Sequence, residues 1–358
     1  MDAKKVVVGM SGGVDSSVAA MLLKQQGYEV IGATYDFWHD DDDPEDIYRN
    51  LSDAAEAKKV AEVLGIEHRA INYTKEFRSR VEEYFVSEYL KGRTPNPCAR
   101  CNPNVKWAAM LMTADEVGAL YVATGHYARI DRLSNGRYAI KNSVTAKKDQ
   151  TYVLYGLSQE QLSRTLMPIG EYEKDMVRQL AGEAKLPVAD KPDSQEICFV
   201  DDDDYASYIE EKAPQAEIKK GNFVDSRGNI IGPHEGITHY TIGQRRGLGI
   251  AAGHRIFVTA IDTATGNVVL GENEELFVSE VFCDSVVFMA SEKMNVGEKK
   301  HIKAKIRYNH SGEYGELEML DEDRAVCRFE KKVRAATPGQ PMVFYDGDYV
   351  FGGGTICL

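Results

Sequence analysis

The sequence predicts an α/β domain with a parallel sheet, followed by a small, mostly β domain and a C-terminal β-barrel domain. Three observations lead to this prediction. In the first part of the chain, short apolar runs alternate with helical patterns of about a dozen residues. Beyond about residue 200, short strands and turn signals replace the helices. The 358 residues are also too many for one ordinary core. We place the domains at residues 1–200, 201–270 and 271–358.

The first domain is built from strand–helix units. Apolar, β-branched runs predict strands at residues 4–9, 28–35, 66–73 and 119–128. Helical spacing predicts helices at residues 18–27, 53–65, 75–92 and 105–118. Asp53 is the expected N-cap of the second helix, and Gly27 and Gly65 are expected to end the first two helices. Such alternation favours right-handed βαβ units on a parallel sheet.

The rest of the chain has the pattern of antiparallel β-structure. Strands are expected within residues 223–232, 255–271, 301–308, 325–335 and 342–354. The stretches TATGN and YDGD inside two of these segments are hairpin-turn signals. The acidic runs at residues 39–46 and 201–204 are expected to be solvated loops.

Composition narrows the class of protein. Hydrophobic content of 43% and charged content of 28% are typical of a soluble globular protein. No signal peptide and no membrane span is expected, so we expect a cytoplasmic protein whose six cysteines are reduced. Reduced cysteines point to metal binding or catalysis rather than disulfides. The net charge of −13 argues weakly against a nucleic-acid partner, although a local basic surface can coexist with it.

The stretch GMSGGVDSS, residues 9–17, has the features of a nucleotide-binding loop. It lies between a predicted strand and a helix, whose free N–H groups and dipole attract an anion. Gly12 and Gly13 allow close approach of a phosphate, and Asp15 suits a bound Mg²⁺. The loop lacks the lysine of a Walker A motif. SGGxDS is the pyrophosphatase-loop signature, in which ATP is cleaved between its α and β phosphates. The alternative is a serine–glycine turn without a ligand.

A second candidate lies in ATGHYA, where another predicted strand ends. Ligands of open α/β sheets bind at the carboxyl ends of the strands, so Gly125 and His126 are expected at the same edge as Ser11. A lone histidine is as often structural as functional, and both interpretations stay open for His126.

The stretch GRTPNPCARCN contains a Cys-x-x-Cys pair in a proline-rich loop. Asn102 is a possible N-cap and Pro103 a possible first helical residue, which would place Cys101 at a helix N-terminus and lower the pKa of its thiol. A zinc ribbon would need a second such pair, which is absent. A redox dithiol or a structural loop is possible, but catalytic sulfur or cluster chemistry with Cys198 is favoured. The remaining cysteines lie in apolar runs and are expected to be buried: Cys283, Cys327 and Cys357.

An ordered set of motifs carries a family resemblance. SGGVDSSV, GRTPNP with a following CN, ATGHYA, KKDQTYVLY, DSQEICFV, HYTIGQRRGLGI and TPGQ occur in this order. The chain resembles the bacterial tRNA 2-thiouridylases along essentially its whole length. Single motifs, SGGVDS especially, are shared by several ATP-pyrophosphatase enzymes, whereas the ordered set is specific.

The resemblance implies an activity. A sulfurtransferase would adenylate the C2 oxygen of the wobble uridine in tRNAs for Lys, Glu and Gln, release pyrophosphate, and replace the oxygen by sulfur. It implies an adenine nucleotide alpha hydrolase-like first domain, a central domain and a tRNA-binding barrel. ATP and Mg²⁺ are the expected cofactors, a cysteine desulfurase or relay protein the sulfur donor, and a monomer the expected state.

The resemblance also implies residue roles. ATP would be bound at Gly9, Met10, Ser11, Gly12, Gly13, Val14, Asp15, Ser16, Tyr35 and Gly125. The target base would be met by Asn96, Pro97 and Cys98, and other parts of the tRNA by His126, Lys148, Asp149, Gln150, Arg307, Tyr308 and Gln340. Cys101 takes the place of the nucleophile, and Cys198 that of the persulfide carrier. If residues 299–308 form a strand, Lys303, Lys305 and Arg307 share one face that can extend a basic surface.

One residue departs from the family pattern, because Cys98 stands where an aspartate is usual. Either Cys98, Cys101 and Cys198 hold a 4Fe–4S cluster with one open iron, or Cys98 merely replaces the acid and the persulfide route stands. Three cysteines within two motifs of one domain slightly favour the cluster.

Other functions stay open at this point. A 2-thiocytidine-forming tRNA enzyme also uses paired cysteines. A lysidine- or argininosuccinate-type ligase would need none. A nucleotide-binding RNA module without catalysis is disfavoured by the intact Ser11, Asp15, Cys101 and Cys198.

Overall fold

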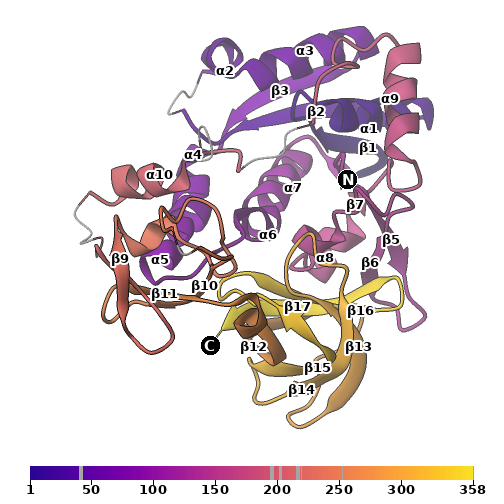
Figure 1. Ribbon diagram of the computed structural model, residues 1–358. Helices are drawn as coiled ribbons and strands as arrows, with labels where there is room; N and C mark the ends of the chain where they lie inside the picture. Colours follow the sequence, from indigo (N-terminus) through magenta and orange to yellow (C-terminus); the bar gives the residue numbers. More distant parts are fainter. Residues whose placement is uncertain are drawn as a thin grey trace.

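The computed structural model describes residues 1–39, 43–193, 197–200, 204–214, 218, 220–251 and 253–357. The acidic residues 40–42 and 201–203, where we expected solvated loops, lie outside the described residues. The chain forms three sheets: an α/β layer, a small central sheet and a C-terminal barrel (Figure 1). In the described part of the chain, no helix has the length and apolarity that crossing a membrane requires.

The first sheet is parallel, as the sequence predicted. Its strand order is β3-β2-β1-β4-β7, and every neighbouring pair runs in parallel. The strands are β1 (Asp2–Gly9), β2 (Glu29–Asp36), β3 (Glu67–Asn72), β4 (Ala119–Ala123) and β7 (Thr165–Leu166). Val6, Val7 and Val8 at its centre are fully buried. The sheet is therefore covered on both faces.

Helices cover the two faces because successive β1 side chains point to opposite sides. Val6 and Val8 pack with residues of α1, α3 and α9, whereas Val7 packs with residues of α7. The helical segments of this domain are α1 (Val14–Gln25), α2 (Pro44–Asn50), α3 (Ser52–Leu64), α4 (Thr74–Phe77), η1 (Arg78–Glu82), α5 (Glu83–Leu90), α6 (Pro97–Cys101), η2 (Asn102–Lys106), α7 (Trp107–Glu116), η3 (Thr151–Leu154), α8 (Gln159–Ser163) and α9 (Lys174–Glu183).

Helix ends confirm two expectations and correct one. Gly27 and Gly65 follow the last residues of α1 and α3 with left-handed φ angles of 87° and 59°. Asp53 is not the N-cap of α3, because the helix begins at Ser52, one residue before Asp53, and Leu51 is in the N-cap position. The carboxylate of Asp53 instead pairs with Lys191 at 2.8 Å. The Asp53 carboxylate therefore forms a long-range ion pair instead of the backbone hydrogen bond that capping rules predict.

The central sheet has the order β10-β11-β8-β9. It contains β8 (Gly221–Val224), β9 (Ile230–His234), β10 (Phe257–Asp262) and β11 (Asn267–Gly271), accompanied by α10 (Tyr205–Lys212), η5 (Ile237–His239) and η6 (Asn273–Leu276). β10 and β11 pair antiparallel across the expected hairpin turn. Phe223, Val258 and Leu270 form the middle of its core.

The C-terminal strands close into a barrel, as expected. They are β12 (Phe277–Phe288), β13 (Lys299–Lys305), β14 (Glu313–Met319), β15 (Ala325–Arg334), β16 (Pro341–Asp346) and β17 (Tyr349–Cys357). β12 pairs with both β15 and β17, which closes the ring. A hairpin of the first domain, β5 (Ala128–Arg132) and β6 (Tyr138–Asn142), extends the barrel sheet through the pair Tyr349–Lys141. Nothing in the sequence pattern indicated this shared sheet.

The proline-rich loop at residues 92–96 is held by both downstream domains. The Thr94 N–H donates to the Pro338 carbonyl at 2.8 Å, and Gln340 Nε2 donates to the Thr94 carbonyl at 2.9 Å. From the central domain, the Thr241 hydroxyl lies 3.1 Å from the Thr94 hydroxyl. Gly339 has a φ of 93° and little room for a side chain, since a Cβ would lie 3.0 Å from the Thr94 backbone. We call these contacts the Thr94 clamp.

The Thr94 clamp predicts a difference between two glycine substitutions. Gly339→Ala adds a left-handed backbone penalty and a clash with Thr94, whereas Gly347→Ala, at φ 58°, adds the backbone penalty alone because its Cβ meets nothing. The backbone term is about 1–2 kcal/mol. We expect Gly347→Ala to lower the free energy of unfolding by about that amount and Gly339→Ala by clearly more. Equal losses in chemical denaturation would show that the clamp adds nothing.

Candidate functional site

The loop after β1 is folded by its own hydroxyl groups. The Ser11 N–H donates to Ser16 Oγ at 3.2 Å, and Ser17 Oγ donates to the Gly13 carbonyl at 2.7 Å. Gly12 has a φ of 64°, and a Cβ there would lie 2.5 Å from the Asp53 carbonyl oxygen. The loop is thus pressed between α1 and α3, with the free N–H groups of α1 at its open end.

The loop lies at the switch point of the sheet. The chain adds β2 and β3 on one side of β1 and then β4 on the other, so the loops after β1 and β4 border one crevice. Gly125 follows β4, and a Cβ on it would lie 2.5 Å from Ser16 N. The ATP-binding residues expected at Gly9 to Ser16 and at Gly125 therefore share one edge.

Tyr35 does not point into this crevice. Its hydroxyl donates to Thr113 Oγ1 on α7 at 2.9 Å, and burial raises the pKa of its phenol above the usual range. The ring lines a separate cavity of about 430 Å³ with Tyr48, His68 and Met112. Only the backbone of Tyr35, one residue before the end of β2, is at the edge where the nucleotide is expected.

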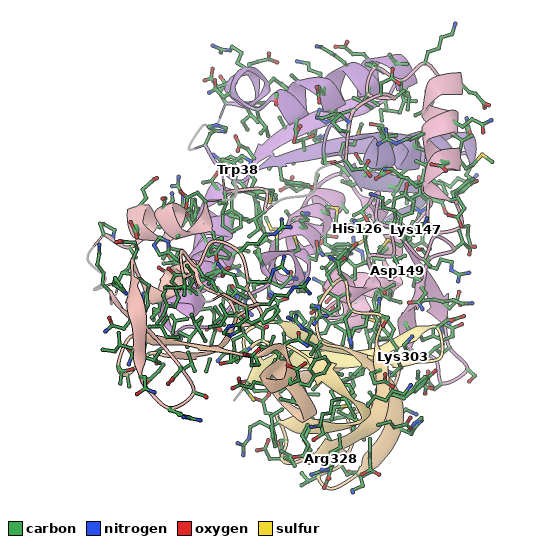
Figure 2. All side chains as sticks on the ribbon, in the orientation of Figure 1. Trp38, His126, Lys147, Asp149, Lys303 and Arg328 are labelled. Carbon is green, nitrogen blue, oxygen red and sulfur yellow. The ribbon has the colours of Figure 1, made fainter. Side chains whose placement is uncertain are left out.

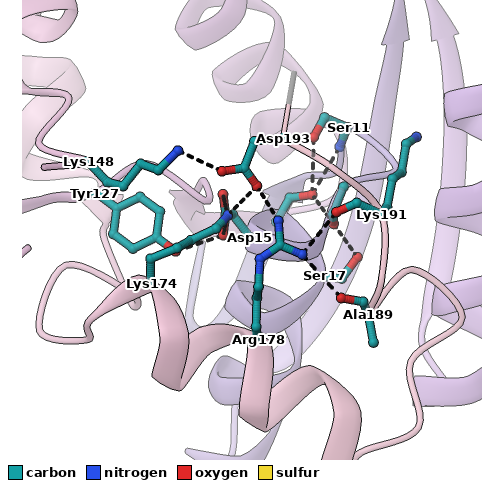
Figure 3. Close-up of polar contacts among 12 residues, drawn as sticks. Ser11, Asp15, Ser17, Tyr127, Lys148, Lys174, Arg178, Ala189, Lys191 and Asp193 are labelled. Atoms are coloured by element: carbon teal, nitrogen blue, oxygen red, sulfur yellow. Dashed lines mark hydrogen bonds and ion pairs between the residues drawn. The ribbon is translucent and has the colours of Figure 1, made fainter. Parts of the chain in front are cut away.

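Asp15, the expected Mg²⁺ ligand, is occupied by protein partners. Lys174 Nζ lies 2.8 and 2.9 Å from its two oxygens, and the Tyr127 hydroxyl donates to Oδ1 at 2.8 Å (Figure 3). Burial of Tyr127 and the neighbouring Asp15 carboxylate raise the pKa of the Tyr127 phenol, which stays protonated. A Mg²⁺ ion on Asp15 would have to replace Lys174, so this arrangement does not fit Asp15 as a metal ligand.

The cysteine helix begins earlier than expected. Asn96 caps α6 by accepting a hydrogen bond from the Ala99 N–H at 3.0 Å, and Pro97 is its first residue. The helix then continues through the π-helical segment η2 into α7 without a new N-terminus at Asn102. Cys98, not Cys101, is therefore near the helix N-terminus. A π-turn accommodates Pro103 inside the helix, which the capping rules do not anticipate.

The pKa expected for Cys101 is also wrong. Cys101 is buried, and burial raises the pKa of its thiol to about 12 despite the neighbouring Lys106. Burial likewise raises the pKa of Cys198 to about 11, although the residue as a whole is exposed. Both thiols are protonated at neutral pH. Lys106 opposes both shifts.

Helix geometry places Lys106 with the thiols. Cys98 and Cys101 are three residues apart in α6, and Lys106 follows five residues later across the π-helical segment, so all three share one face. Burial alone would lower the pKa of Lys106, but Cys101, Cys98 and Cys198 together hold it above its usual value. Lys106 is the cation of this cysteine site, and the sequence analysis missed it.

An aromatic wall brings the Cys198 segment to Cys101. Cys101 packs in a cluster with Phe77, Trp38 and Phe199, which follows Cys198 directly. The Phe77 and Phe199 rings are 5.4 Å apart. The two expected catalytic cysteines therefore lie in one neighbourhood. Cys283 and Cys327 are buried in the barrel, as expected, and Cys357 is partly exposed.

The cysteine site does not have the arrangement of a metal centre. In the residues that the structure describes, no three His, Cys, Asp or Glu side chains are grouped so as to hold a metal ion. Cys101 is buried while Cys98 and Cys198 are exposed. This arrangement does not support the expected 4Fe–4S cluster on Cys98, Cys101 and Cys198, which stays a prediction.

His126 lies between the nucleotide loop and the cysteine helix. Its ring contacts Trp107 at 5.6 Å, and its Nδ1 is 2.9 Å from Thr124 Oγ1. Burial and Lys106 lower the pKa of His126 to about 3. His126 is therefore neutral at physiological pH and cannot provide a positive charge to RNA.

Some of the residues expected to contact tRNA form hydrogen bonds within the protein, whereas others are exposed. Asp149 accepts from the Ser143 and Thr151 N–H groups, and Gln150 Oε1 accepts from the Tyr127 N–H at 2.9 Å. Both side chains thus hold their own loop. From the barrel, Tyr308 is 39% exposed and within electrostatic reach of Asp149 and Cys98. Figure 2 shows His126, Asp149 and Lys303 following one another from the α/β layer to the barrel.

Two further expected tRNA contacts are bound by protein. Arg307 Nη1 donates to the Arg334 carbonyl at 2.7 Å, and Gln340 belongs to the Thr94 clamp. The expected basic face of β13 is present in part, since Lys303 and Lys305 share one side of the strand. Lys305 is half-buried over the Tyr345 ring, 5.5 Å from its centroid.

Comparison with known proteins identifies the class first. Residues 4–202 match the model of the tRNA methyl transferase HUP domain, residues 207–272 that of the tRNA methyl transferase PRC-barrel domain, and residues 278–356 that of the aminomethyltransferase beta-barrel domain. A HUP-type nucleotide-binding domain with two β domains is the class that the three sheets define.

Relatives identify the family within this class. The tRNA-specific 2-thiouridylase MnmA of Lachnoclostridium phytofermentans is 52% identical over 99% of both chains. The proteins of the same name from Clostridioides difficile and Acetivibrio thermocellus are each 50% identical, over 99% of this chain and 98% and 100% of their own. The chain belongs to the tRNA-specific 2-thiouridylase family.

A matched pair of glycine substitutions tests the nucleotide loop. Gly125→Ala places a Cβ 2.5 Å from Ser16 N, so the loop must shift, whereas Gly182→Ala in α9 meets nothing. We expect Gly125→Ala to weaken ATP binding at least about tenfold, because the loop N–H groups lose their alignment. Gly182→Ala should leave binding unchanged and stabilise α9 by up to about 1 kcal/mol. Unchanged ATP affinity in Gly125→Ala, measured by calorimetry, would contradict the assigned site.

A second prediction concerns Lys106. Its ammonium lowers the pKa of Cys198, so Lys106→Met should raise that pKa and slow alkylation of Cys198 at every pH between 7 and 9.5, by up to about tenfold. In the native protein the rate should rise with pH without a plateau, because the pKa is about 11. Lys106→Arg keeps the charge and should keep the rate. Peptide-resolved mass spectrometry measures the rate, and equal rates in Lys106→Met and the native protein would contradict this role.

Proposed function

We propose that this protein is an ATP-dependent tRNA 2-thiouridylase, a sulfurtransferase that converts the wobble uridine of tRNA to 2-thiouridine. The observation that carries the proposal is the identity of about half of all residues with proteins of that name over 99% of the chain. The geometry supports it, because a nucleotide loop and a two-thiol site lie on adjoining segments of one domain.

In the first step, the C2 oxygen of uridine attacks the α-phosphorus of ATP. The bond to the β-phosphate breaks, pyrophosphate leaves, and AMP becomes attached to the oxygen, which makes that oxygen a good leaving group. Ser11, Ser16 and the N–H groups that begin α1 are suited to hold the phosphates. Mg²⁺ would neutralise phosphate charge in this step, with ligands other than Asp15 while Asp15 is paired with Lys174.

In the second step, sulfur replaces the oxygen. The terminal sulfur of a persulfide on Cys198 attacks C2, and AMP leaves with the original oxygen. The Cys101 thiolate then attacks the inner sulfur of Cys198, which releases 2-thiouridine and leaves a Cys101–Cys198 disulfide for an external thiol to reduce. Because the thiols are protonated at neutral pH, Lys106 is suited to stabilise each thiolate as it forms.

The tRNA is expected to lie across the α/β domain and the barrel. Asn96, Pro97 and Cys98 are proposed at the target base, with the exposed Tyr308 beside them. His126, Lys148, Asp149, Gln150, Arg307 and Gln340 are proposed to act near the tRNA, several of them by holding their loops. We propose tRNAs for Lys, Glu and Gln as substrates, a cysteine desulfurase or relay protein as sulfur donor, and a cytoplasmic monomer.

The function is tested on unmodified tRNA with ATP, cysteine and a cysteine desulfurase. Mass spectrometry of the digested nucleosides should show 2-thiouridine that depends on ATP. Cys101→Ser and Cys198→Ser should abolish it, at least about a thousandfold, since each supplies a covalent step. Cys357→Ser, a partly exposed cysteine of the barrel, is the matched control and should retain activity.

Other outcomes of this experiment identify the alternatives. Formation of 2-thiocytidine would make the protein a different tRNA thiolase, and pyrophosphate release that survives both cysteine substitutions would indicate a cysteine-independent ligase. Iron measured after anaerobic purification separates the two sulfur routes. About four irons per chain that are lost in Cys98→Ala would overturn the persulfide route in favour of a cluster.

A further inference from the structure

Three cations converge on one carboxylate beside the nucleotide loop. Lys148 Nζ lies 2.8 Å from Asp193 Oδ2, and Lys174 Nζ and Arg178 Nη2 each lie 2.7 Å from Asp193 Oδ1 (Figure 3). The residues come from a loop, from two successive turns of α9 and from the segment that follows it. We call Lys148, Lys174 and Arg178 the cation triad. It was not apparent in the sequence, since Lys174 and Arg178 belong to none of the motifs and lie 26 and 30 residues after Lys148.

The cation triad adjoins the first turn of α1. Lys174 bridges Asp193 and Asp15, the second residue of α1, and its side chain is only 11% exposed. The loop itself has no lysine of the Walker type. Lys174 therefore supplies, from a distant part of the chain, a cation at the helix N-terminus where phosphates are expected.

The local charges leave a positive excess around this carboxylate. Three cations face Asp193 and Asp15, whereas the neighbouring Lys191 has two acidic partners of its own, Asp53 and Glu56. The cations hold the pKa of Asp193 at about 2 against the effect of burial, so it is ionised at any physiological pH. The Asp193 carboxylate accepts charge-assisted hydrogen bonds from all three cations, and one phosphate group could accept the same bonds.

We propose that Lys148, Lys174 and Arg178 form an anion site for the terminal phosphates of ATP and for the pyrophosphate released from it, and that Asp193 occupies this site as an internal anion that the phosphates replace. The inference rests on the proposed function only in taking ATP as the nucleotide. A backbone phosphate of RNA is the other source of the same chemistry. The burial of Lys174 and its contact with Asp15 favour the nucleotide.

The site is tested by the binding of inorganic pyrophosphate to the full-length protein without tRNA, in equilibrium dialysis. Asp193→Asn removes the competing charge and keeps the shape, so pyrophosphate should bind about tenfold more tightly. Lys174→Met and Arg178→Met should weaken binding about tenfold or more. Lys5→Met removes a lysine of equal charge at the opposite edge of the sheet, beside Glu29, and should change nothing.

Lys148→Gln keeps the test valid if the more buried substitutions impair folding. Its side chain is 41% exposed, so the variant should melt like the native protein and still bind pyrophosphate severalfold more weakly. In Asp193→Asn the pyrophosphate affinity is the decisive measurement, because the loss of a purely structural ion pair would not raise it. A structural anchor would lose stability on this change without gaining pyrophosphate affinity.

Three results would overturn the proposal. The first is unchanged or weaker pyrophosphate binding in Asp193→Asn in a folded protein. The second is native pyrophosphate affinity in both Lys174→Met and Lys148→Gln. The third is a loss of tRNA binding in these variants without a loss of pyrophosphate binding, which would assign the cations to RNA. None of these results depends on thiolation. Failure to form 2-thiouridine would contradict the proposed function and leave pyrophosphate binding intact.

Discussion

The Thr94 clamp is the constraint on which the cysteine site depends. Two residues beyond Thr94, Asn96 caps α6, and the position of this cap determines where Cys98, Cys101 and Lys106 lie on the helix. The clamp draws one partner from the central domain and two from the barrel. The downstream domains therefore fix the start of the cysteine helix.

Burial and charge act against each other at the site that this helix forms. The aromatic wall around Cys101 excludes water, and burial keeps the thiol of Cys101 protonated. Lys106 lowers the pKa of the Cys101 and Cys198 thiols, yet not enough to ionise them at rest. Protonated thiols react slowly with stray electrophiles and oxidants, since the thiolate is the nucleophile. Thiols of this kind react when a substrate or a neighbouring charge stabilises the thiolate, which is consistent with the proposed persulfide route.

The sequence predicted what depends on local pattern. Strand alternation gave the parallel sheet, and the strand–loop–helix context placed Ser11 and Gly125 at one edge, because the switch point follows from strand order. The predicted helix starts were wrong where tertiary contacts outweigh local capping preferences. Asp53 pairs with Lys191 instead of capping α3, and Asn96 instead of Asn102 begins the cysteine helix. Capping preferences are worth only about 1 kcal/mol, so they do not by themselves decide at which residue a helix begins.

Residues that follow α9 contact both the surroundings of the nucleotide loop and the cysteine site. Arg178 donates to the Lys191 carbonyl at 3.0 Å and pairs with Asp193, which fixes one end of the segment beside the nucleotide loop. Phe199, six residues after Asp193, packs in the aromatic wall at Cys101. Asp193 is therefore held by charge beside the nucleotide loop, and Phe199 is held by aromatic packing beside Cys101. If phosphates replace Asp193, as proposed, the ion pairs of Asp193 are lost, whereas the packing of Phe199 does not depend on them.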